Sequence, residues 1–313
     1  MPIVKPENMN FSDKNIIMIL SGLPGTGKTT LALSAPDVLL IDTDEGLARV
    51  NPAHRKDASV CKTYEEILAD IKEAKGHYKT IVIDTCGALI EYMKDWAVRT
   101  DPKASKANGG FSLQGYGVIK SEFVRLSAEL RKDFNVIYLF HESMTKNDDS
   151  VFYELVVEGS TRTLVYQPAD LAGHLFIDHG KRYVGFTPTE QYSAKAAYGI
   201  KGIIEIPELK EGDPNDFLTK LFDKVRKNLA AENEELNPQR AAYEEAIAIA
   251  KEICGLVEGP EDVEHAATAM KNIKHALTSE KEAKARLKAR IAELGIVWDK
   301  TAKVYKYAET KDN

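Results

Sequence analysis

One short stretch constrains this chain more than any other, and it reads Gly22-Leu23-Pro24-Gly25-Thr26-Gly27-Lys28-Thr29. It fits the spacing G-x-x-x-x-G-K-S/T of a phosphate-binding loop. An apolar run at 16–20 leads into it, and a helix-type run at 28–35, stopped by Pro36, leads out. A strand, a glycine-rich loop and a helix in this order predict an α/β sheet with an anion site at the end of its first strand.

The residue types of this loop suit phosphate. Glycines let the backbone curl so that successive N–H groups point at one anion, and the start of the following helix adds partial positive charge. We expect Lys28 to reach the β- and γ-phosphates of ATP or GTP, and Thr29 to offer its hydroxyl to Mg²⁺. The expected nucleotide-binding residues are Gly22, Pro24, Gly25, Thr26, Gly27, Lys28, Thr29 and Thr30.

Composition excludes several classes of protein. The chain has 313 residues, 43% of them hydrophobic, which suffices for one large globular domain or two ordinary ones. No apolar run approaches the length of a membrane span, and the N-terminal residues lack the apolar region of a secretory signal. Three cysteines far apart predict no disulfide framework, so we expect a cytoplasmic protein with no membrane partner.

Short apolar runs alternate with helical patterns over the first 210 residues. Buried strands are predicted at 38–42, 81–84 and 136–140, and helices at 64–74, 88–98 and 117–132. Further strands are predicted at 151–157, 175–178, 182–186 and 203–206, and a closing helix at 216–228. This order predicts an α/β fold with a mostly parallel sheet flanked by helices.

The composition changes beyond residue 229. We assign 1–229 to a nucleotide-binding core and 239–313 to a small helical C-terminal domain that ends in a hairpin at 297–307. The acidic segment 230–238 between them is a linker or an exposed helix end. Helices are predicted there at 240–256, 261–277 and 280–294. Between Lys271 and Arg290 lie seven Lys or Arg and two Glu, so the third helix has a basic face that contacts DNA, docks on a partner or is simply solvated.

Polar residues follow three of the predicted strands. Asp84 ends the strand at 81–84 as a Walker-B-type acid, so with Thr29 it forms the expected Mg²⁺ site. Asp44 and Glu45 follow the strand at 38–42, and either is a candidate general base for the attacking water. His141 follows the strand at 136–140 as a candidate sensor of the γ-phosphate. The alternatives are a helix cap, a solvated acidic turn and a structural histidine. The candidate catalytic residues are thus Lys28, Asp44, Glu45 and His141.

The segments GLPGTGKTT, VLLIDTDEG, TIVIDT and VIYLFHES are together similar to the motifs of RecA-like ATPases, which have an AAA-type nucleotide-binding domain. They most resemble those of phage-encoded ATP-binding proteins of single-strand annealing and recombination. The resemblance covers 14–210. It implies a RecA-like core that hydrolyses ATP with Mg²⁺ in a homo-oligomer, a ring or a filament. A basic residue then reaches ATP from the neighbouring subunit, and Lys195 and Lys201 occupy that place, where an arginine is often found.

RecA-like proteins contact DNA through two loops, and residues 99–115 occupy the place of the first. This segment carries Arg99, Lys103, Lys106 and Phe111, which are cations for phosphates and a ring for base stacking. An ordinary surface loop is the alternative. The resemblance implies single-stranded DNA as partner, DNA-stimulated ATP hydrolysis, a single-strand-binding protein as a further candidate partner, and the cytoplasm of a bacterial host if the protein is phage-encoded.

Two other functions stay open on the sequence. A small-molecule P-loop kinase would need a lid with several arginines, and no such cluster is visible. A non-motor regulator or assembly factor would use ATP only to order an interface. Three results would distinguish these functions. DNA-dependent ATP turnover would favour the ATPase that acts on DNA, and phosphoryl transfer to a small molecule without DNA would favour the kinase. Tight ATP binding with negligible turnover would favour the regulator.

Overall fold

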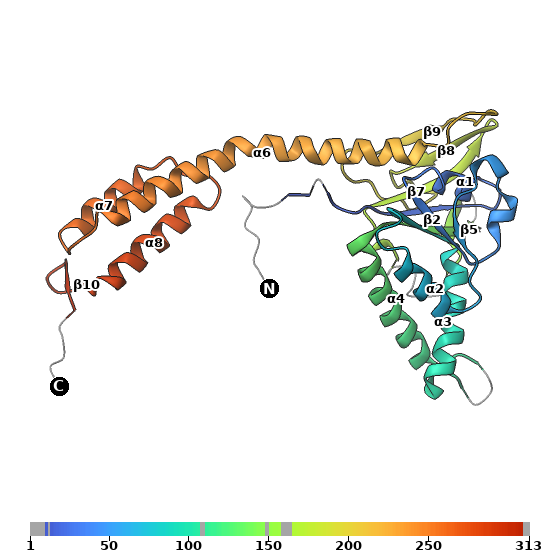
Figure 1. The fold of residues 1–313 in the computed structure, drawn as a ribbon, viewed down its shortest axis with the longest axis horizontal. Coiled ribbons are helices and arrows are strands. Elements are labelled where there is room, and N and C mark those ends of the chain that lie inside the picture. Colours follow the sequence, from blue (N-terminus) through green and yellow to red (C-terminus); the bar gives the residue numbers. More distant parts are fainter. Residues whose placement is uncertain (1–9, 12, 107–109, 148–149, 158–164, 309–313) are drawn as a thin grey trace. The chain divides into compact units, whose positions relative to one another are not determined.

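The computed structural model describes residues 10–11, 13–106, 110–147, 150–157 and 165–308 (Figure 1). The chain divides into two compact units. The larger comprises residues 14–228, and the smaller comprises 1–13 together with 229–313. Each unit has a hydrophobic core of its own and is described by itself.

The larger unit is built on one sheet. Its strands are β1 (Ile17–Gly22), β2 (Val38–Asp42), β3 (Ala58–Ser59), β4 (Thr80–Asp84), β5 (Asn135–Asn147), β6 (Ser150–Leu155), β7 (Leu171–Asp178), β8 (Lys181–Gly185) and β9 (Ile203–Ile206). They lie in the order β3-β2-β4-β5-β1-β7-β8-β9, and β6 pairs with β5. Strands β3 through β7 in this order are parallel, whereas β8 and β9 are antiparallel. The predicted mostly parallel sheet is confirmed.

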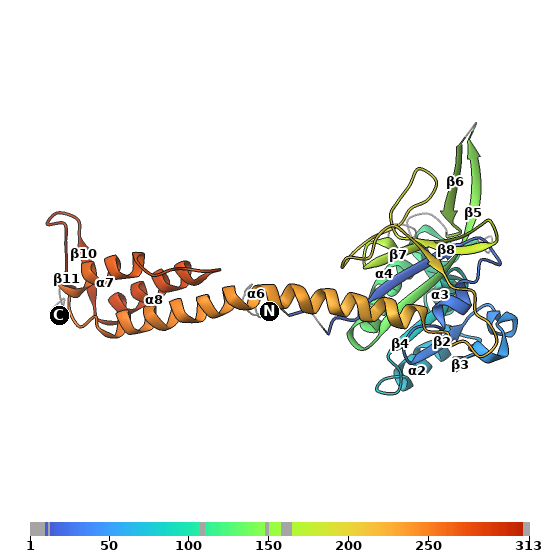
Figure 2. The same cartoon turned by 90° about the horizontal axis from the view of Figure 1, so that it is seen from above.

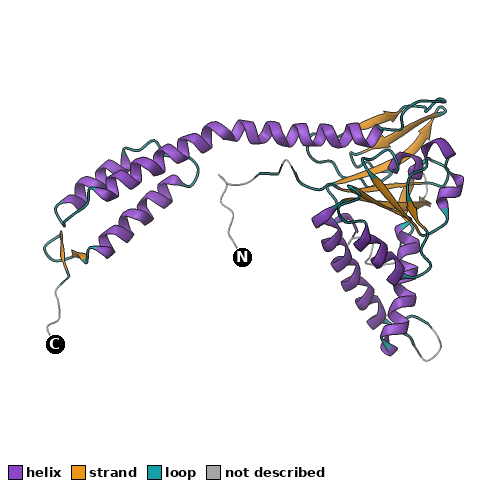
Figure 3. Ribbon diagram, in the orientation of Figure 1, coloured by secondary structure: helices purple, strands orange, loops and turns teal. Residues whose placement is uncertain are grey.

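Helices cover both faces of this sheet (Figure 3). Helices α2 (Tyr64–Glu73), α3 (Cys86–Thr100) and α4 (Leu113–Asp133) pack on one face, and α1 (Lys28–Ala32) with the first turns of α6 (Phe217–Gly255) packs on the other. Ile17 and Ile19 of β1 belong to the core under α2–α4, and the alternating Met18 and Leu20 are also buried. A strand covered on both faces is apolar throughout, as the run at 16–20 is.

Side-chain caps set where the three longer helices of the larger unit begin. Thr63, Thr85 and Ser112 each accept a hydrogen bond from a backbone N–H in the first turn of α2, α3 and α4, respectively. Such caps satisfy donors that have no partner inside the helix. Because Thr85 directly follows β4, α3 begins at the carboxyl edge of the sheet.

Strand β5 is longer than the predicted strand at 136–140. It continues through His141 to Asn147 and forms an antiparallel hairpin with β6 (Figure 2). Its first part pairs with β1 and β4 inside the sheet, and its second part pairs with β6 alone. His141 therefore lies within a strand, at the point where β5 leaves the parallel sheet.

The smaller unit contains the rest of α6, α7 (Asp262–Lys271), α8 (Ser279–Glu293) and a hairpin of β10 (Ile296–Asp299) and β11 (Val304–Tyr307). The segment 230–238, which we expected to be a linker or an exposed helix end, is helical within α6. Its Ala, Glu and Leu residues are strong helix formers, and this outweighs its lack of large apolar side chains. Among the described residues, no helix is long and apolar enough to cross a membrane.

Candidate active site

The phosphate-binding loop joins β1 to α1 and is shaped by its glycines. Gly25 and Gly27 have φ of 82° and 92°, a conformation that residues with a side chain rarely adopt. A Cβ on Gly22 would lie 2.6 Å from the carbonyl oxygen of Leu175 on β7, so this position excludes a side chain. Pro24 and Gly25 form the exposed tip, and Thr26 folds back to bond the carbonyl of Leu23 at 2.9 Å.

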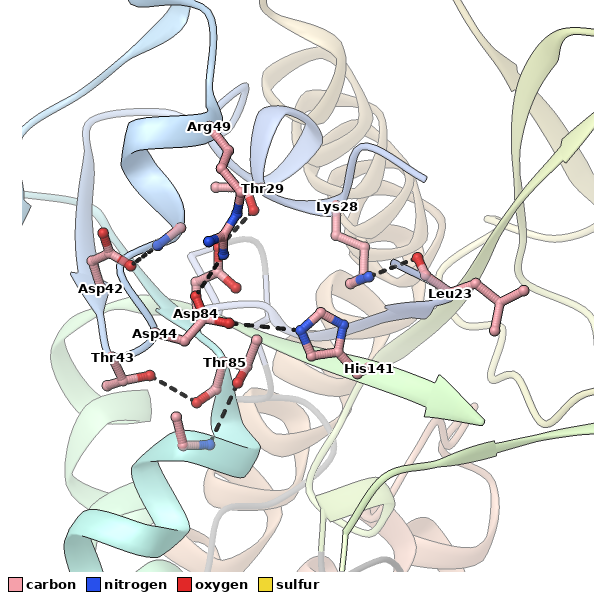
Figure 4. Close-up of polar contacts among 12 residues, drawn as sticks. Leu23, Lys28, Thr29, Asp42, Thr43, Asp44, Arg49, Asp84, Thr85 and His141 are labelled. Atoms are coloured by element: carbon pink, nitrogen blue, oxygen red, sulfur yellow. Dashed lines mark hydrogen bonds and ion pairs between the residues drawn. The ribbon is translucent and has the colours of Figure 1, made fainter. Parts of the chain in front are cut away.

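Lys28 lies across this loop (Figure 4). Its Nζ donates to the carbonyl oxygens of Gly22 and Leu23 at 2.9 and 3.0 Å, and the residue is buried. Burial lowers the pKa of Lys28, while the nearby charges of Asp84, Glu142 and Asp44 act in the opposite direction. The ammonium is therefore a poorly solvated cation beside the loop, which favours an incoming anion.

Thr29 and Asp84 meet between α1 and the end of β4. The Thr29 hydroxyl donates to Oδ2 of Asp84 at 2.6 Å. Burial raises the pKa of Asp84 to about 6, and the charges of Asp44 and Asp42 add to that effect. A hydroxyl and a buried carboxylate are oxygen ligands that suit Mg²⁺. No cluster of three or more His, Cys, Asp or Glu that could hold a metal occurs among the described residues.

The two acids after β2 have different surroundings. Oδ2 of Asp44 lies 3.6 Å from Nε2 of His141, and its Oδ1 lies 3.2 Å from a guanidinium nitrogen of Arg49. Glu45 is exposed with a φ of 57°, and no hydrogen bond or ion pair holds its carboxylate in the described part of the chain. The structure thus brings Asp44, and not Glu45, to the other candidate residues.

The turn that carries Asp44 is held by its neighbours on both sides. Asp42 accepts hydrogen bonds from the backbone N–H groups of Gly46 and Leu47 at 2.7 and 3.0 Å. A Cβ on Gly46 would lie 3.0 Å from Oδ1 of Asp44 and 3.2 Å from Oδ2 of Asp84. Asp42 therefore fixes the turn, and Gly46 leaves the space in which the Asp44 and Asp84 carboxylates approach each other.

His141 stands beside the loop because β5 pairs with β1, and the register places it opposite Gly22. Its side chain is 40% exposed, while its Nδ1 is buried without a partner among the described residues. Burial first and the charge of Lys28 second lower the pKa of His141, so the imidazole is neutral at pH 7. Its 3.6 Å separation from Asp44 is too long for a hydrogen bond, which leaves both groups available to a ligand.

A buried pair lies directly behind this histidine. The Glu142 carboxylate lies 2.8 Å from Nδ1 of His174 on β7, and their side chains are 2% and 3% exposed. The His174 ring stacks on Tyr192 with centroids 4.1 Å apart. Sequence reasoning missed this pair because the pairing of β7 with β1, which brings the two residues together, has no local signature.

Arg182 is a second residue that sequence reasoning missed. It lies on β8, and a Cβ on Gly27 would come within 3.3 Å of its Nε. It lines a cavity of about 450 Å³ beside the loop together with Thr30, Asn51 and Asn215. Asn215 donates to the Thr30 carbonyl at 2.8 Å. Within the described ranges Arg182 has no acidic partner, so it is a cation held at the edge of the phosphate loop.

Lys195, expected to act on a neighbouring subunit, is engaged within its own chain. Its backbone exchanges two hydrogen bonds with Ala172 of β7, and its Nζ donates to the carbonyl of Ala169. Lys201 is exposed. Reaching a neighbouring subunit would require Lys195 to leave the Ala169 carbonyl.

The segment that carries the four candidate DNA-binding residues begins in the last turn of α3, at the end of that helix that lies away from the sheet (Figure 1). Helix α3 has 15 residues and spans about 22 Å from its start at the sheet edge. Arg99 makes two hydrogen bonds to Glu65 on α2, at 2.7 and 3.0 Å. Phe111 is partly buried and packs edge-on against Tyr116. Lys103 and Lys106 are exposed, and 107–109 lie outside the described residues.

A family model matches the part of the chain that carries this site. Residues 14–198, more than half of the chain, match the family model of the AAA domain. A comparison with curated proteins finds no match. Among solved structures, the chain is similar to an ATPase from the type III secretion system of pathogenic bacteria, with 11% identity, 90% of this chain and 81% of that chain covered, and a TM-score of 0.36. That likeness is too low to carry an argument.

Proposed function

Because this chain belongs to the AAA domain family, we propose that it is an ATPase that hydrolyses ATP with Mg²⁺ and acts on single-stranded DNA in phage-type recombination or annealing. The observation that carries the ATPase proposal is the convergence of five side chains at the carboxyl edge of adjacent strands. They are Lys28, Thr29, Asp44, Asp84 and His141 (Figure 4).

ATP binding uses the loop and the residues on both sides of it. The Lys28 ammonium exchanges the carbonyls of Gly22 and Leu23 for the β- and γ-phosphates. Thr29 and Asp84 would hold Mg²⁺, and the bound ion would neutralise charge that develops on the phosphates. The cavity beside the loop takes the nucleoside, and the unpaired Arg182 contacts its phosphate side.

Asp44 is the residue that we assign as general base. Its carboxylate faces the same space as Asp84 and His141, which is where the γ-phosphate and an attacking water would meet. Arg49 orients Asp44 through its Oδ1 and leaves Oδ2 toward His141. Neutral His141 can then donate one hydrogen bond to the γ-phosphate. That hydrogen bond is lost when the phosphate leaves, which is how His141 would sense hydrolysis.

The DNA-related part of the proposal rests on the resemblance and on two exposed cations, Lys103 and Lys106. The same resemblance supports a homo-oligomer, ring or filament, in which Lys195 approaches a neighbour's ATP, and a single-strand-binding protein as a further partner. Arg99 and Phe111 contribute to DNA binding only if they leave Glu65 and Tyr116.

The experiment is phosphate release by the purified protein with Mg²⁺ and ATP, alone, with single-stranded oligo(dT) and with duplex DNA, over a salt titration. We expect turnover that single strands stimulate and that salt suppresses. The Lys28→Ala variant should be inactive under all conditions. The double variant Lys103→Ala/Lys106→Ala should keep basal turnover and lose the stimulation.

The two halves of the proposal fail separately. Wild-type turnover that ignores every DNA would refute the role on DNA and leave the ATPase standing. Absence of turnover in the wild type, or unchanged turnover in Lys28→Ala, would refute the ATPase itself and favour a non-motor regulator.

A further inference from the structure

Positive charge gathers in the last part of the smaller unit. Residues 270–308 hold ten Lys or Arg against four Asp or Glu, whereas the whole chain has a net charge of −6. This segment comprises α8, the β10–β11 hairpin and the connection from α7, and it lies outside the residues that match the AAA domain. A local excess of this size in an acidic protein attracts acidic ligands to one place.

The same segment forms a cavity of about 470 Å³ between α7, α8 and the hairpin. These elements lie side by side in both Figure 1 and Figure 2. Met270, Leu287 and Ile291 give the cavity an aliphatic floor, and Trp298 and Tyr305 form its wall on the hairpin. Trp298, one of the two tryptophans in the chain, has a large apolar side chain that is nevertheless 45% exposed. A large ring left half-exposed beside an apolar hollow marks a binding surface.

Three lysines are among the residues that line this cavity. Lys271, Lys284 and Lys288 line it, together with one acid, Glu280, which pairs with Lys284 at 2.6 Å. Neither Lys271 nor Lys288 has an acidic partner in the part of the chain that the structure describes. The hollow thus combines an apolar floor with two unneutralised cations on its rim.

We propose that this groove binds an acidic segment of another protein and takes up one of its large apolar side chains. The aliphatic floor accommodates a Phe, Leu or Ile side chain, and Lys271 and Lys288 pair with carboxylates on either side of it. Single-stranded nucleic acid fits less well, because bases stack on open ring faces. Here Trp298 and Tyr305 meet edge to face, at 64° and 4.8 Å, beside the aliphatic side chains of Met270, Leu287 and Ile291.

The test uses the full chain with Trp96→Phe, so that Trp298 is the remaining tryptophan. Fluorescein-labelled peptides rich in Asp and Glu, with Phe, Leu or Ala at the centre, are titrated by anisotropy, and Trp298 emission is followed with unlabelled peptides. Oligo(dT) of matched charge is titrated in parallel. We expect the Phe and Leu peptides to bind, to change Trp298 emission, and to bind about tenfold tighter than the Ala peptide.

Substitutions locate the site. Lys271→Glu/Lys288→Glu should weaken peptide binding about tenfold or more, and Trp298→Ala should do the same. The matched control is Lys281→Glu, an exposed lysine on the same helix outside the cavity, which should change binding less than about twofold.

Three outcomes would overturn the proposal. They are no binding of any acidic peptide, binding that the lysine pair and Trp298→Ala leave unchanged, and oligo(dT) binding that is tighter than peptide binding and depends on the same residues. The last result would make the groove a nucleic-acid site.

Discussion

The ionised carboxylate of Asp84 destabilises the folded protein, and replacement of Asp84 by Asn should remove this effect. Burial beside Asp44 and Asp42 raises the pKa of Asp84 from 3.8 to about 6. At about 1.4 kcal/mol for each pKa unit, ionised Asp84 lowers the free energy of unfolding by about 3 kcal/mol at pH 7.5 without Mg²⁺ and nucleotide. An Asn can still accept the hydroxyl of Thr29, so Asp84→Asn should be more stable than wild type by up to this amount.

The sign of the pH dependence follows from the direction of the shift. A carboxyl with a raised pKa in the folded state favours folding when it is protonated, so the cost of Asp84 is present above pH 6 and disappears below pH 3.8. The advantage of Asp84→Asn should therefore shrink to about half at pH 5 and to less than about 1 kcal/mol at pH 4.

The assay is urea unfolding of wild type and Asp84→Asn at these pH values, followed by the emission of Trp96 in a Trp298→Phe background. This reports the larger unit alone, because Trp96 lies on α3 and Trp298 lies in the smaller unit. The control is Asp95→Asn, an exposed acid on α3, which should change stability by less than about 0.5 kcal/mol. Equal or lower stability of Asp84→Asn at pH 7.5, or a difference that ignores pH, would refute the reasoning. With Mg²⁺ and ATP the order should reverse, because wild type gains binding energy that the variant lacks.

Four further results are expected. Asp44→Asn should lower kcat about a hundredfold while Glu45→Gln stays within about twofold, as steady-state phosphate release would show; the reverse order would make Glu45 the base. Arg182→Ala should raise the KM for ATP about tenfold with little change in kcat, and an unchanged KM would remove Arg182 from the nucleotide site. Turnover should not fall as pH rises from 6.5 to 8, because the lowered pKa of His141 keeps its imidazole neutral; a pH–rate profile that declines there would contradict this assignment. Gly22→Ala should lower the free energy of unfolding by about 1–3 kcal/mol, because its Cβ meets the Leu175 carbonyl at 2.6 Å, and an unaltered urea midpoint would show that β7 moves aside.

The sequence was sufficient for those parts of the site that depend on local spacing. Lys28 and Thr29 follow from the loop pattern, and Asp84 and His141 follow from apolar runs whose carboxyl ends meet at one edge of a parallel sheet. Which of Asp44 and Glu45 lies beside His141 was beyond it, because that depends on which way one turn residue points.

Contacts between distant segments were also out of reach. Arg182 lies at the loop because β8 follows β7 beside β1, and Glu142 meets His174 through the same pairing. In the segment 99–115, the pairing of Arg99 with Glu65 depends on the packing of α2 against α3, which a charge pattern does not encode. The helix through 230–238 is a different case. Its Ala, Glu and Leu residues favour a helix, but its acidic charge and lack of large apolar side chains are also typical of a linker.

The ligand site lies at the carboxyl end of the strands, and the strands at the two ends of the main strand order are short. The strands at the two ends of the main order are β3, with two residues, and β9, with four. Glu205 of β9 pairs with Lys181 of β8, and both side chains are exposed, as is that of Ile203 on β9. Short outer strands with charges give an incoming strand few backbone groups to pair with. Joining copies of this chain through β3 or β9 would therefore involve few backbone hydrogen bonds, so that side-chain contacts would carry most of such an interface.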